Sequence, residues 1–279
     1  MQSITTLIAA PGGEEALRDT VTGLTADWLG PEACDLAGAD EAAVMAAVAG
    51  RPIDIITRPA AGRRKRLLVA DLESTIIENE MLEELADFLG LRAHVAGITR
   101  RAMNGEIDFV GALTERVALL RGMPESVLDE AAQRIRLMPG ARTLIATLRR
   151  NGVKTALVSG GFTVFAERVA AELGFDRVVA NRLDIADGKL AGTVRAPIVT
   201  GATKRDTLVA LGGEFGLTLD ETMAVGDGAN DLPMLGTAGL GIAFHAKPAV
   251  AAASRWRVDH ADLTALLYAQ GYREQEIFG

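Results

Sequence analysis

Apolar residues along the first sixty positions alternate between two spacings. Period-two or continuous runs predict strands, whereas three- and four-residue spacing predicts helices. We therefore expect strands at 3–9, 33–37 and 53–57 and helices at 13–28 and 40–48. This segment carries no glycine-rich loop and no cluster of acids and histidines, so we expect no chemistry from it.

The stretch 58–65 breaks this pattern with Pro59, Gly62 and several charges, which marks a boundary between two units. We interpret the basic cluster here as a solvated linker, because runs of like charge usually face water. The cluster consists of Arg63, Arg64, Lys65 and Arg66. The pattern thus predicts a small N-terminal α/β domain over 1–62 and a larger domain over 63–279.

Strands and helices alternate through the larger domain, which is the signature of a doubly wound parallel sheet of the α/β class. The expected strands lie at 66–70, 153–158, 177–180, 222–225 and 239–243. Four helical segments at 78–89, 92–103, 109–120 and 124–136 separate the first two strands. They are too many for one crossover, so we expect an inserted helical cap over about 79–137. Asp187-Gly188, between alternating residues, predicts a β-hairpin.

Composition narrows the class of protein. The 279 residues are 49% hydrophobic but only 4% aromatic, as expected for a layered α/β core of small aliphatic side chains. A formal charge of -8 argues against a nucleic-acid-binding surface, which needs clustered cations. The single cysteine, Cys34, excludes an intramolecular disulfide, and no apolar run approaches the roughly 20 residues of a membrane span. We expect a cytoplasmic protein without nucleic-acid or membrane partners, and a homodimer is an open alternative to a monomer.

Acidic side chains follow the first strand of the larger domain, in the segment VADLESTII. Asp71 comes directly after Leu67-Leu68-Val69-Ala70, and Glu73 lies two residues further on. The carboxyl ends of parallel strands face the ligand crevice, so both acids would lie at its mouth. Acids at i and i+2 project to one side of an extended chain, which would let one attack and the other transfer a proton. The structural alternative is a helix N-cap cluster that includes Ser74 and Thr75.

A second acidic group follows the strand at 222–225, in the segment GDGANDLPML. It places Asp227, Asn230 and Asp231 on a glycine-rich turn at another strand end. Carboxylates that converge from two strand ends make a hard oxygen site suited to Mg²⁺. The alternative is a solvated turn.

Two further positions fit phosphate chemistry. Ser159-Gly160 ends the strand at 153–158 and precedes a helix, so its hydroxyl and amides could bind phosphate oxygens. Lys204 begins another helix and could neutralise charge on a transferring phosphoryl group. Each alone has an ordinary structural explanation, a serine cap or a surface lysine. Their order along the chain with the two acidic groups favours function.

Together these residues resemble the haloacid dehalogenase superfamily, and the match to its phosphoserine phosphatase members is closer still, over about 66–260. The resemblance implies Mg²⁺-dependent hydrolysis of O-phospho-L-serine, the last step of serine biosynthesis, through an aspartyl-phosphate on Asp71. It makes Glu73 the general acid and base. Phosphoryl oxygens would bind Ser159, the Gly160 amide and Lys204. The metal would bind Asp71, the Glu73 carbonyl and Asp227, with Asn230 and Asp231 positioning substrate, ligands and waters.

The resemblance also extends to the cap. Glu80 matches the family's glutamate for the substrate amino group, and Arg116 matches its arginine for the carboxylate, a pairing suited to a zwitterion. Met103 and Phe109 lie at family-like spacing beside them. Without the resemblance, an exposed helix face would explain Glu80 and Arg116.

Glu73 departs from the usual family pattern, in which this position is aspartate. The extra methylene could disturb a positioned proton transfer, which leaves open whether water or another alcohol accepts the phosphoryl group. A relative of the phosphoserine:homoserine phosphotransferase type also carries Asp-x-Glu, and a phosphatase for another small phosphoester is a further alternative. A non-enzymatic alternative is an amino-acid sensor, whose N-terminal unit resembles a truncated ACT module.

Overall fold

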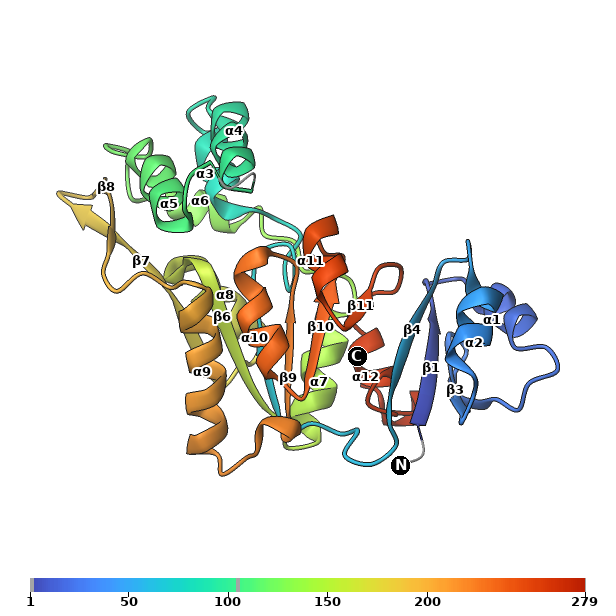
Figure 1. The fold of residues 1–279 in the computed structure, drawn as a ribbon. Helices are drawn as coiled ribbons and strands as arrows, with labels where there is room; N and C mark the ends of the chain where they lie inside the picture. Colours follow the sequence, from blue (N-terminus) through green and yellow to red (C-terminus); the bar gives the residue numbers. More distant parts are fainter. Residues whose placement is uncertain (1–2, 104–105, 279) are drawn as a thin grey trace.

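The computed structural model describes residues 3–103 and 106–278 and contains two β-sheets, joined by the segment that follows β4 (Figure 1). The first sheet has the strand order β2-β3-β1-β4, and its pairs are antiparallel. Its strands are β1 (Ser3–Ala9), β2 (Asp27–Gly30), β3 (Ala33–Ala37) and β4 (Ile53–Pro59). Two helices accompany it, α1 (Glu14–Thr20) and α2 (Glu41–Val48).

The helix expected at 13–28 is wrong in its second half. Helix α1 ends at Thr20, Gly23 has a φ of 84°, and Trp28 lies in strand β2. Glycine at positive φ interrupts a helix, and pairing of Trp28 with Cys34 in β3 outweighs the local helical spacing. The other elements expected in this unit are confirmed.

The second sheet confirms the predicted doubly wound architecture. Its seven strands have the order β11-β10-β9-β5-β6-β7-β8, and every pair is parallel except β7 with β8. The strands are β5 (Leu67–Ala70), β6 (Lys154–Phe162), β7 (Arg177–Ala186), β8 (Lys189–Arg195), β9 (Thr222–Gly226), β10 (Leu240–Phe244) and β11 (Trp256–Val258). The short strand β11 was not expected from the sequence.

Helices cover both faces of this sheet because successive residues of a buried strand point to opposite sides. Leu68 and Ala70 pack with α7 (Ala141–Arg150), α8 (Thr163–Leu173) and α12 (Ala265–Tyr268). Leu67 and Val69 pack with α9 (Gly201–Glu214), α10 (Leu232–Thr237) and α11 (Pro248–Ala253). Short 3₁₀ turns occur at Leu219–Glu221, Ala229–Asp231 and Glu274–Glu276.

The central strand β5 determines where a ligand can lie. After β5 the chain adds β6 and β7 on one side, then returns to add β9, β10 and β11 on the other. Strand order therefore reverses between β5 and β9. In open parallel sheets such a switch point leaves a crevice at the carboxyl ends of the strands.

Four helices inserted between β5 and the helix before β6 form the expected cap above this edge (Figure 1). They are α3 (Met81–Asp87), α4 (Arg92–Met103), α5 (Phe109–Ala118) and α6 (Val127–Ala132). The predicted hairpin at Asp187-Gly188 joins β7 to β8 and reaches the cap. There Gly122 N donates to Leu190 O, Leu190 N to Met123 O and Glu125 N to Gly188 O, at 2.8, 2.8 and 2.9 Å.

One hydrophobic core connects the two sheets. Ile8 and Ile56 of the first sheet belong to the same buried cluster as Leu266 and Tyr268 of the second unit. Polar contacts reinforce it, since the Asp54 carboxylate accepts hydrogen bonds from the backbone amides of residues 259–261 at 2.7–3.2 Å. The first sheet is therefore buried on both faces, by its own helices and by the larger unit.

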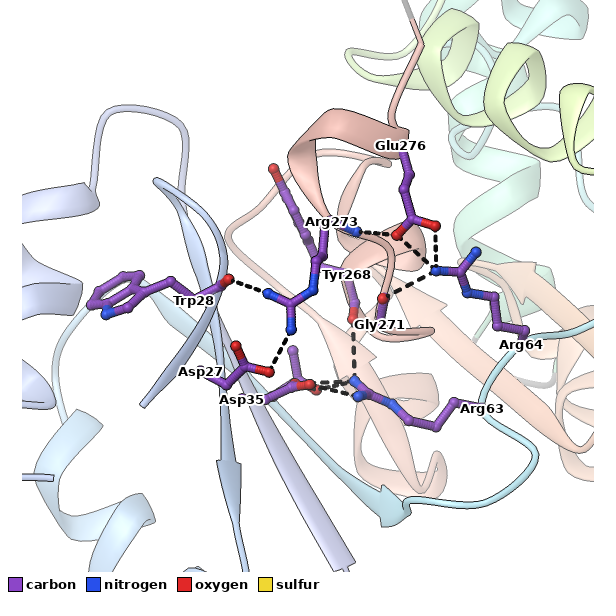
Figure 2. Close-up of polar contacts among 10 residues, drawn as sticks. Asp27, Trp28, Asp35, Arg63, Arg64, Tyr268, Gly271, Arg273 and Glu276 are labelled. Carbon is purple, nitrogen blue, oxygen red and sulfur yellow. Dashed lines mark hydrogen bonds and ion pairs between the residues drawn. The ribbon is translucent and has the colours of Figure 1, made fainter. Parts of the chain in front are cut away.

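The interpretation of the basic cluster as a solvated linker is confirmed for Arg64 and Arg66, which are exposed, and wrong for Arg63 and Lys65. The Arg63 side chain is only 11% exposed, forks onto the Asp35 carboxylate at 2.5 and 3.0 Å and reaches the Tyr268 carbonyl (Figure 2). Lys65 is 4% exposed and donates to the Gly62 and Asp220 carbonyls. The more exposed Arg64 and Arg66 pair with Glu276 and Glu221. Burial follows because the C-terminal segment folds back over the linker (Figure 2). Among the described helices, none has the length and apolar character needed to cross a membrane.

Candidate active site

Asp71 lies at the carboxyl end of β5, at the switch point, and is 6% exposed. Its backbone amide continues the pairing with β9 by donating to Val225 O at 3.0 Å. Its Oδ1 lies 2.7 Å from the Lys204 Nζ, and the same ammonium donates to Asp231 Oδ1 at 2.6 Å. Lys204 is fully buried in the first turns of α9, which Thr200 caps. One lysine thus joins carboxylates that arrive from two different segments.

The glycine-rich turn after β9 holds Asp231 close to the strand. Asp231 is fully buried, and its second carboxylate oxygen accepts the Gly228 amide at 2.9 Å. A Cβ on Gly226 would lie 2.3 Å from the Asp231 carboxyl carbon, so only glycine allows this approach. The sequence pattern of this turn therefore has a steric cause.

Asp227 directly follows strand β9 and has a cation partner that the sequence did not suggest. Its Oδ2 lies 3.1 Å from Nζ of Lys247, which follows the neighbouring strand β10. The Lys247 side chain is 41% exposed, whereas that of Asp227 is 8% exposed. Lys247 stands at a strand end, as Asp71 and Asp227 do, and that position could have identified it.

The carboxylates of Asp71, Asp227 and Asp231 offer oxygens within 4.8 Å of one another. Burial, with the nearby Asp231 charge, raises the pKa of Asp71 to about 8 against the opposing effect of Lys204. Burial also raises the pKa of Asp227 to about 6, although Lys247 lowers it. Hard oxygen donors with raised pKa values in a buried crevice fit a divalent cation, which would relieve their mutual repulsion. The residues present can therefore hold a metal ion.

Ser159 and Gly160 lie within the irregular end of β6 and precede α8, as the sequence predicts. The register with β7 shifts between Val158 and Phe162, and α8 begins only at Thr163. Ser159 is fully buried, and its Oγ accepts the Gly161 amide at 2.9 Å. Asn181, which the sequence did not single out, donates to the Gly160 carbonyl at 2.8 Å and accepts the Val199 amide. It anchors the backbone of this turn from β7.

Glu73 lies beside this turn. Its Oε1 accepts the Met81 amide at the start of α3 at 2.9 Å. A Cβ on Gly161 would lie 2.9 Å from Glu73 Oε2, so glycine leaves room for the longer carboxylate side chain. Burial and the neighbouring Glu80 raise the pKa of Glu73 to about 8. A carboxyl group that holds its proton near neutrality can act as an acid.

The cap supplies residues of both charges. Glu80 Oε1 accepts the Ser74 hydroxyl at 2.8 Å. Arg116 on α5 donates Nε to the Ala112 carbonyl at 3.0 Å and Nη1 to the Thr99 hydroxyl at 3.1 Å. Phe109 begins α5 and reaches the turn of β6, because a Cβ on Gly160 would lie 2.9 Å from its Cζ. Met103 ends α4, but its side chain lies outside the described residues.

A cavity of about 470 Å³ separates the strand ends from the cap. Lys204 and Asp231 do not contribute to its described lining and lie beneath it, where Lys204 contacts both Asp71 and Asp231. Apolar cap residues such as Leu82, Ala112 and Leu113 form part of the wall. The predicted site residues that do line it are Asp71, Glu73, Glu80, Phe109, Arg116, Ser159, Gly160, Asp227 and Asn230, and Thr99 and Lys247 join them. A small charged molecule would therefore meet acids and cations on several sides.

Residues 68–236 match the family model described as haloacid dehalogenase-like hydrolase. Among curated proteins, phosphoserine phosphatase SerB2 of Mycobacterium tuberculosis is 46% identical over 217 residues, which cover 78% of this chain and 53% of that protein. The chain thus spans about half the length of this relative. The phosphoserine phosphatase of Lactococcus lactis is 46% identical over 203 residues, 73% of this chain and 94% of its own.

The comparison with solved structures leads to the same family of proteins. One described as a phospho-aspartyl intermediate analogue of phosphoserine phosphatase has a TM-score of 0.70 and 37% identity. The similarity covers 74% of this chain and 98% of that one.

Proposed function

Since the chain belongs to the haloacid dehalogenase-like hydrolase family, we propose that it hydrolyses O-phospho-L-serine to serine and phosphate, with Asp71 as the nucleophile. The observation that carries this proposal is the Asp71 carboxylate at the base of a cavity whose cap side holds both Glu80 and Arg116. Relatives named phosphoserine phosphatase support the choice of substrate.

The substrate's amino acid part would lie against the cap. Arg116 offers a guanidinium to a carboxylate, and Glu80 offers a carboxylate to an ammonium group. Phe109 and the aliphatic cap side chains exclude water around the serine methylene. Opposite charges at the two ends favour a zwitterion over a simple phosphate monoester. This geometry supports phosphoserine over other small phosphoesters.

Attack by Asp71 would transfer the phosphoryl group to its carboxylate oxygen. Ser159 and Gly160 line the cavity with Asp71, and the Ser159 hydroxyl and the Gly160 amide would bind phosphoryl oxygens. The Lys204 Nζ, 2.7 Å from Asp71 Oδ1, fixes the nucleophile in place. It also offsets the negative charge that gathers here, as transfer of a phosphoryl group requires.

Glu73 would move the protons. With its pKa raised to about 8, it is protonated near neutral pH and can give its proton to the departing serine oxygen. The resulting carboxylate can then accept a proton from the water that hydrolyses the aspartyl-phosphate. Its hydrogen bond from Met81 N keeps the side chain in one position during both steps.

We also propose Mg²⁺ as the metal of this site. Asp71 and Asp227 would hold it with the Glu73 carbonyl, while Asn230 and the buried Asp231 would position substrate and ligands. A bound Mg²⁺ would neutralise phosphate oxygens and the carboxylates. A hard cation fits this donor set because every side-chain ligand is a carboxylate oxygen.

The test measures phosphate release from O-phospho-L-serine with and without Mg²⁺. Asp71→Asn keeps the shape of the side chain but removes the nucleophile, so we expect a loss of about 10³-fold or more in kcat. Asp19→Asn, at an exposed position of α1, is the matched control and should retain full activity. Equal activity in the parent and Asp71→Asn would end the nucleophile assignment. Adding homoserine shows whether an alcohol replaces water, because phosphohomoserine would then accumulate in place of phosphate.

A further inference from the structure

Thr99 lies on α4 and Arg116 on α5, two cap helices that contact one another. Both helices are labelled in Figure 1. Thr99 and Arg116 both line the cavity, together with Ala112 one turn before Arg116. Thr99 has no role in the sequence pattern discussed above. Its position opposite the guanidinium gives it one.

The Thr99 hydroxyl has only one orientation compatible with its contacts. Its Oγ1 lies 3.2 Å from the Val95 carbonyl, one turn earlier in α4, and can only donate to it. Its lone pairs then accept the Arg116 Nη1 at 3.1 Å. On the other side of the guanidinium, Nε donates to the Ala112 carbonyl at 3.0 Å. The guanidinium plane is therefore held by one contact from each helix.

These contacts leave Nη2 without a hydrogen bond to any described residue. We infer that Thr99 is a positioning residue that orients Arg116 so that its remaining N–H groups, those of Nη2 above all, meet the carboxylate of the amino acid substrate. The inference rests on the proposed function, because it requires a substrate with a carboxylate. In this inference Thr99 contacts Arg116 and not the substrate, and Arg116 contacts the substrate.

Acids around Arg116 explain why it needs such a contact. The charges of Glu73, Glu80 and Glu83 all act on the guanidinium. An arginine with free torsions would move toward Glu73 or Glu80 and neutralise groups that the reaction uses. The two directional hydrogen bonds to Thr99 and Ala112 keep it from doing so, and they reduce the entropy lost when the substrate binds.

The experiment compares O-phospho-L-serine with O-phosphoethanolamine, which lacks the carboxylate but keeps the amine and the phosphate. Thr99→Val preserves side-chain shape and removes both hydrogen bonds, whereas Thr99→Ser keeps them. The matched control is Thr114→Val, because Thr114 donates to the carbonyl one turn earlier in α5 but is exposed. Melting temperatures verify that every variant is folded.

We expect Thr99→Val to raise KM for O-phospho-L-serine about tenfold with kcat within about twofold, and to leave the kinetics of O-phosphoethanolamine unchanged. Thr99→Ser and Thr114→Val should match the parent. Equal losses on both substrates, no change on either, or a serine variant as impaired as the valine variant would each overturn the inference. If the parent itself shows no preference for O-phospho-L-serine, the proposed substrate is wrong, and the inference falls with it.

Discussion

The buried ion pair between Arg63 and Asp35 joins the linker to the first sheet, and its energetic contribution can be measured directly (Figure 2). Both side chains are about one-tenth exposed, and the two hydrogen bonds at 2.5 and 3.0 Å form a fork. Arg63→Met leaves the carboxylate with the Thr6 hydroxyl as its one remaining side-chain donor among the described residues, and Asp35→Leu leaves the guanidinium without its anion. Removing one partner of such a pair costs about 3–5 kcal/mol.

The double variant Arg63→Met/Asp35→Leu should be more stable than either single variant, because no buried charge is left unpaired. We expect a coupling energy of about 2 kcal/mol or more from a double-mutant cycle. Urea unfolding measures the free energy of each variant. The matched control is Arg273 with Asp27, which join the same two units at 2.7 Å but are 42% and 61% exposed (Figure 2). That exposed pair should couple by less than about 1 kcal/mol. Equal coupling in the two cycles would refute the claim that burial of the linker arginine holds the two units together.

Cys34 reactivity and metal affinity can also be tested. Burial raises the pKa of the Cys34 thiol to about 12, so a thiol reagent at pH 8 should label the folded chain very slowly and label one thiol per chain after denaturation. Fast labelling of the folded chain would contradict the buried position. Lys247→Gln should strengthen Mg²⁺ binding severalfold in titration calorimetry, because the ammonium 3.1 Å from Asp227 opposes a cation on the same carboxylate. The control Lys154→Gln, at the far end of β6, should have no effect. Weaker Mg²⁺ binding by Lys247→Gln would show that the lysine supports the ion.

The carboxyl ends of the strands could be predicted because a short stretch of sequence is enough to identify each of them. A short apolar run followed by Asp71, Ser159 or Asp227 indicates a buried parallel strand and its exit, and parallel strands bring their exits to one edge. Lys204 could be recognised only from its position along the sequence, between Ser159 and Asp227. The structure adds that it contacts Asp71 and Asp231 from below the cavity.

Other features depend on contacts that no local pattern contains. Arg63 and Lys65 look like solvent-exposed charges until residues more than 150 positions later fold over them. Thr99 becomes informative only once α4 and α5 are packed and its hydroxyl meets Arg116. Trp28 has helical neighbours in sequence but a strand partner in space. In each case, a tertiary contact outweighs the local preference.

The hairpin of β7 and β8 gives the cap a second attachment. The two chain segments that enter and leave the cap lie side by side, with Glu78 N donating to Arg136 O and Met138 N to Ile76 O, both at 2.9 Å. A cap attached only there could rotate as a rigid body about these two segments. The three backbone hydrogen bonds to the hairpin hold it in the closed position. At about 1 kcal/mol each, they would lower the ratio of open to closed cap about a hundredfold relative to a cap without them. Hydrogen bonds that touch no reacting atom would thus lower the frequency with which substrate reaches Asp71 by that movement.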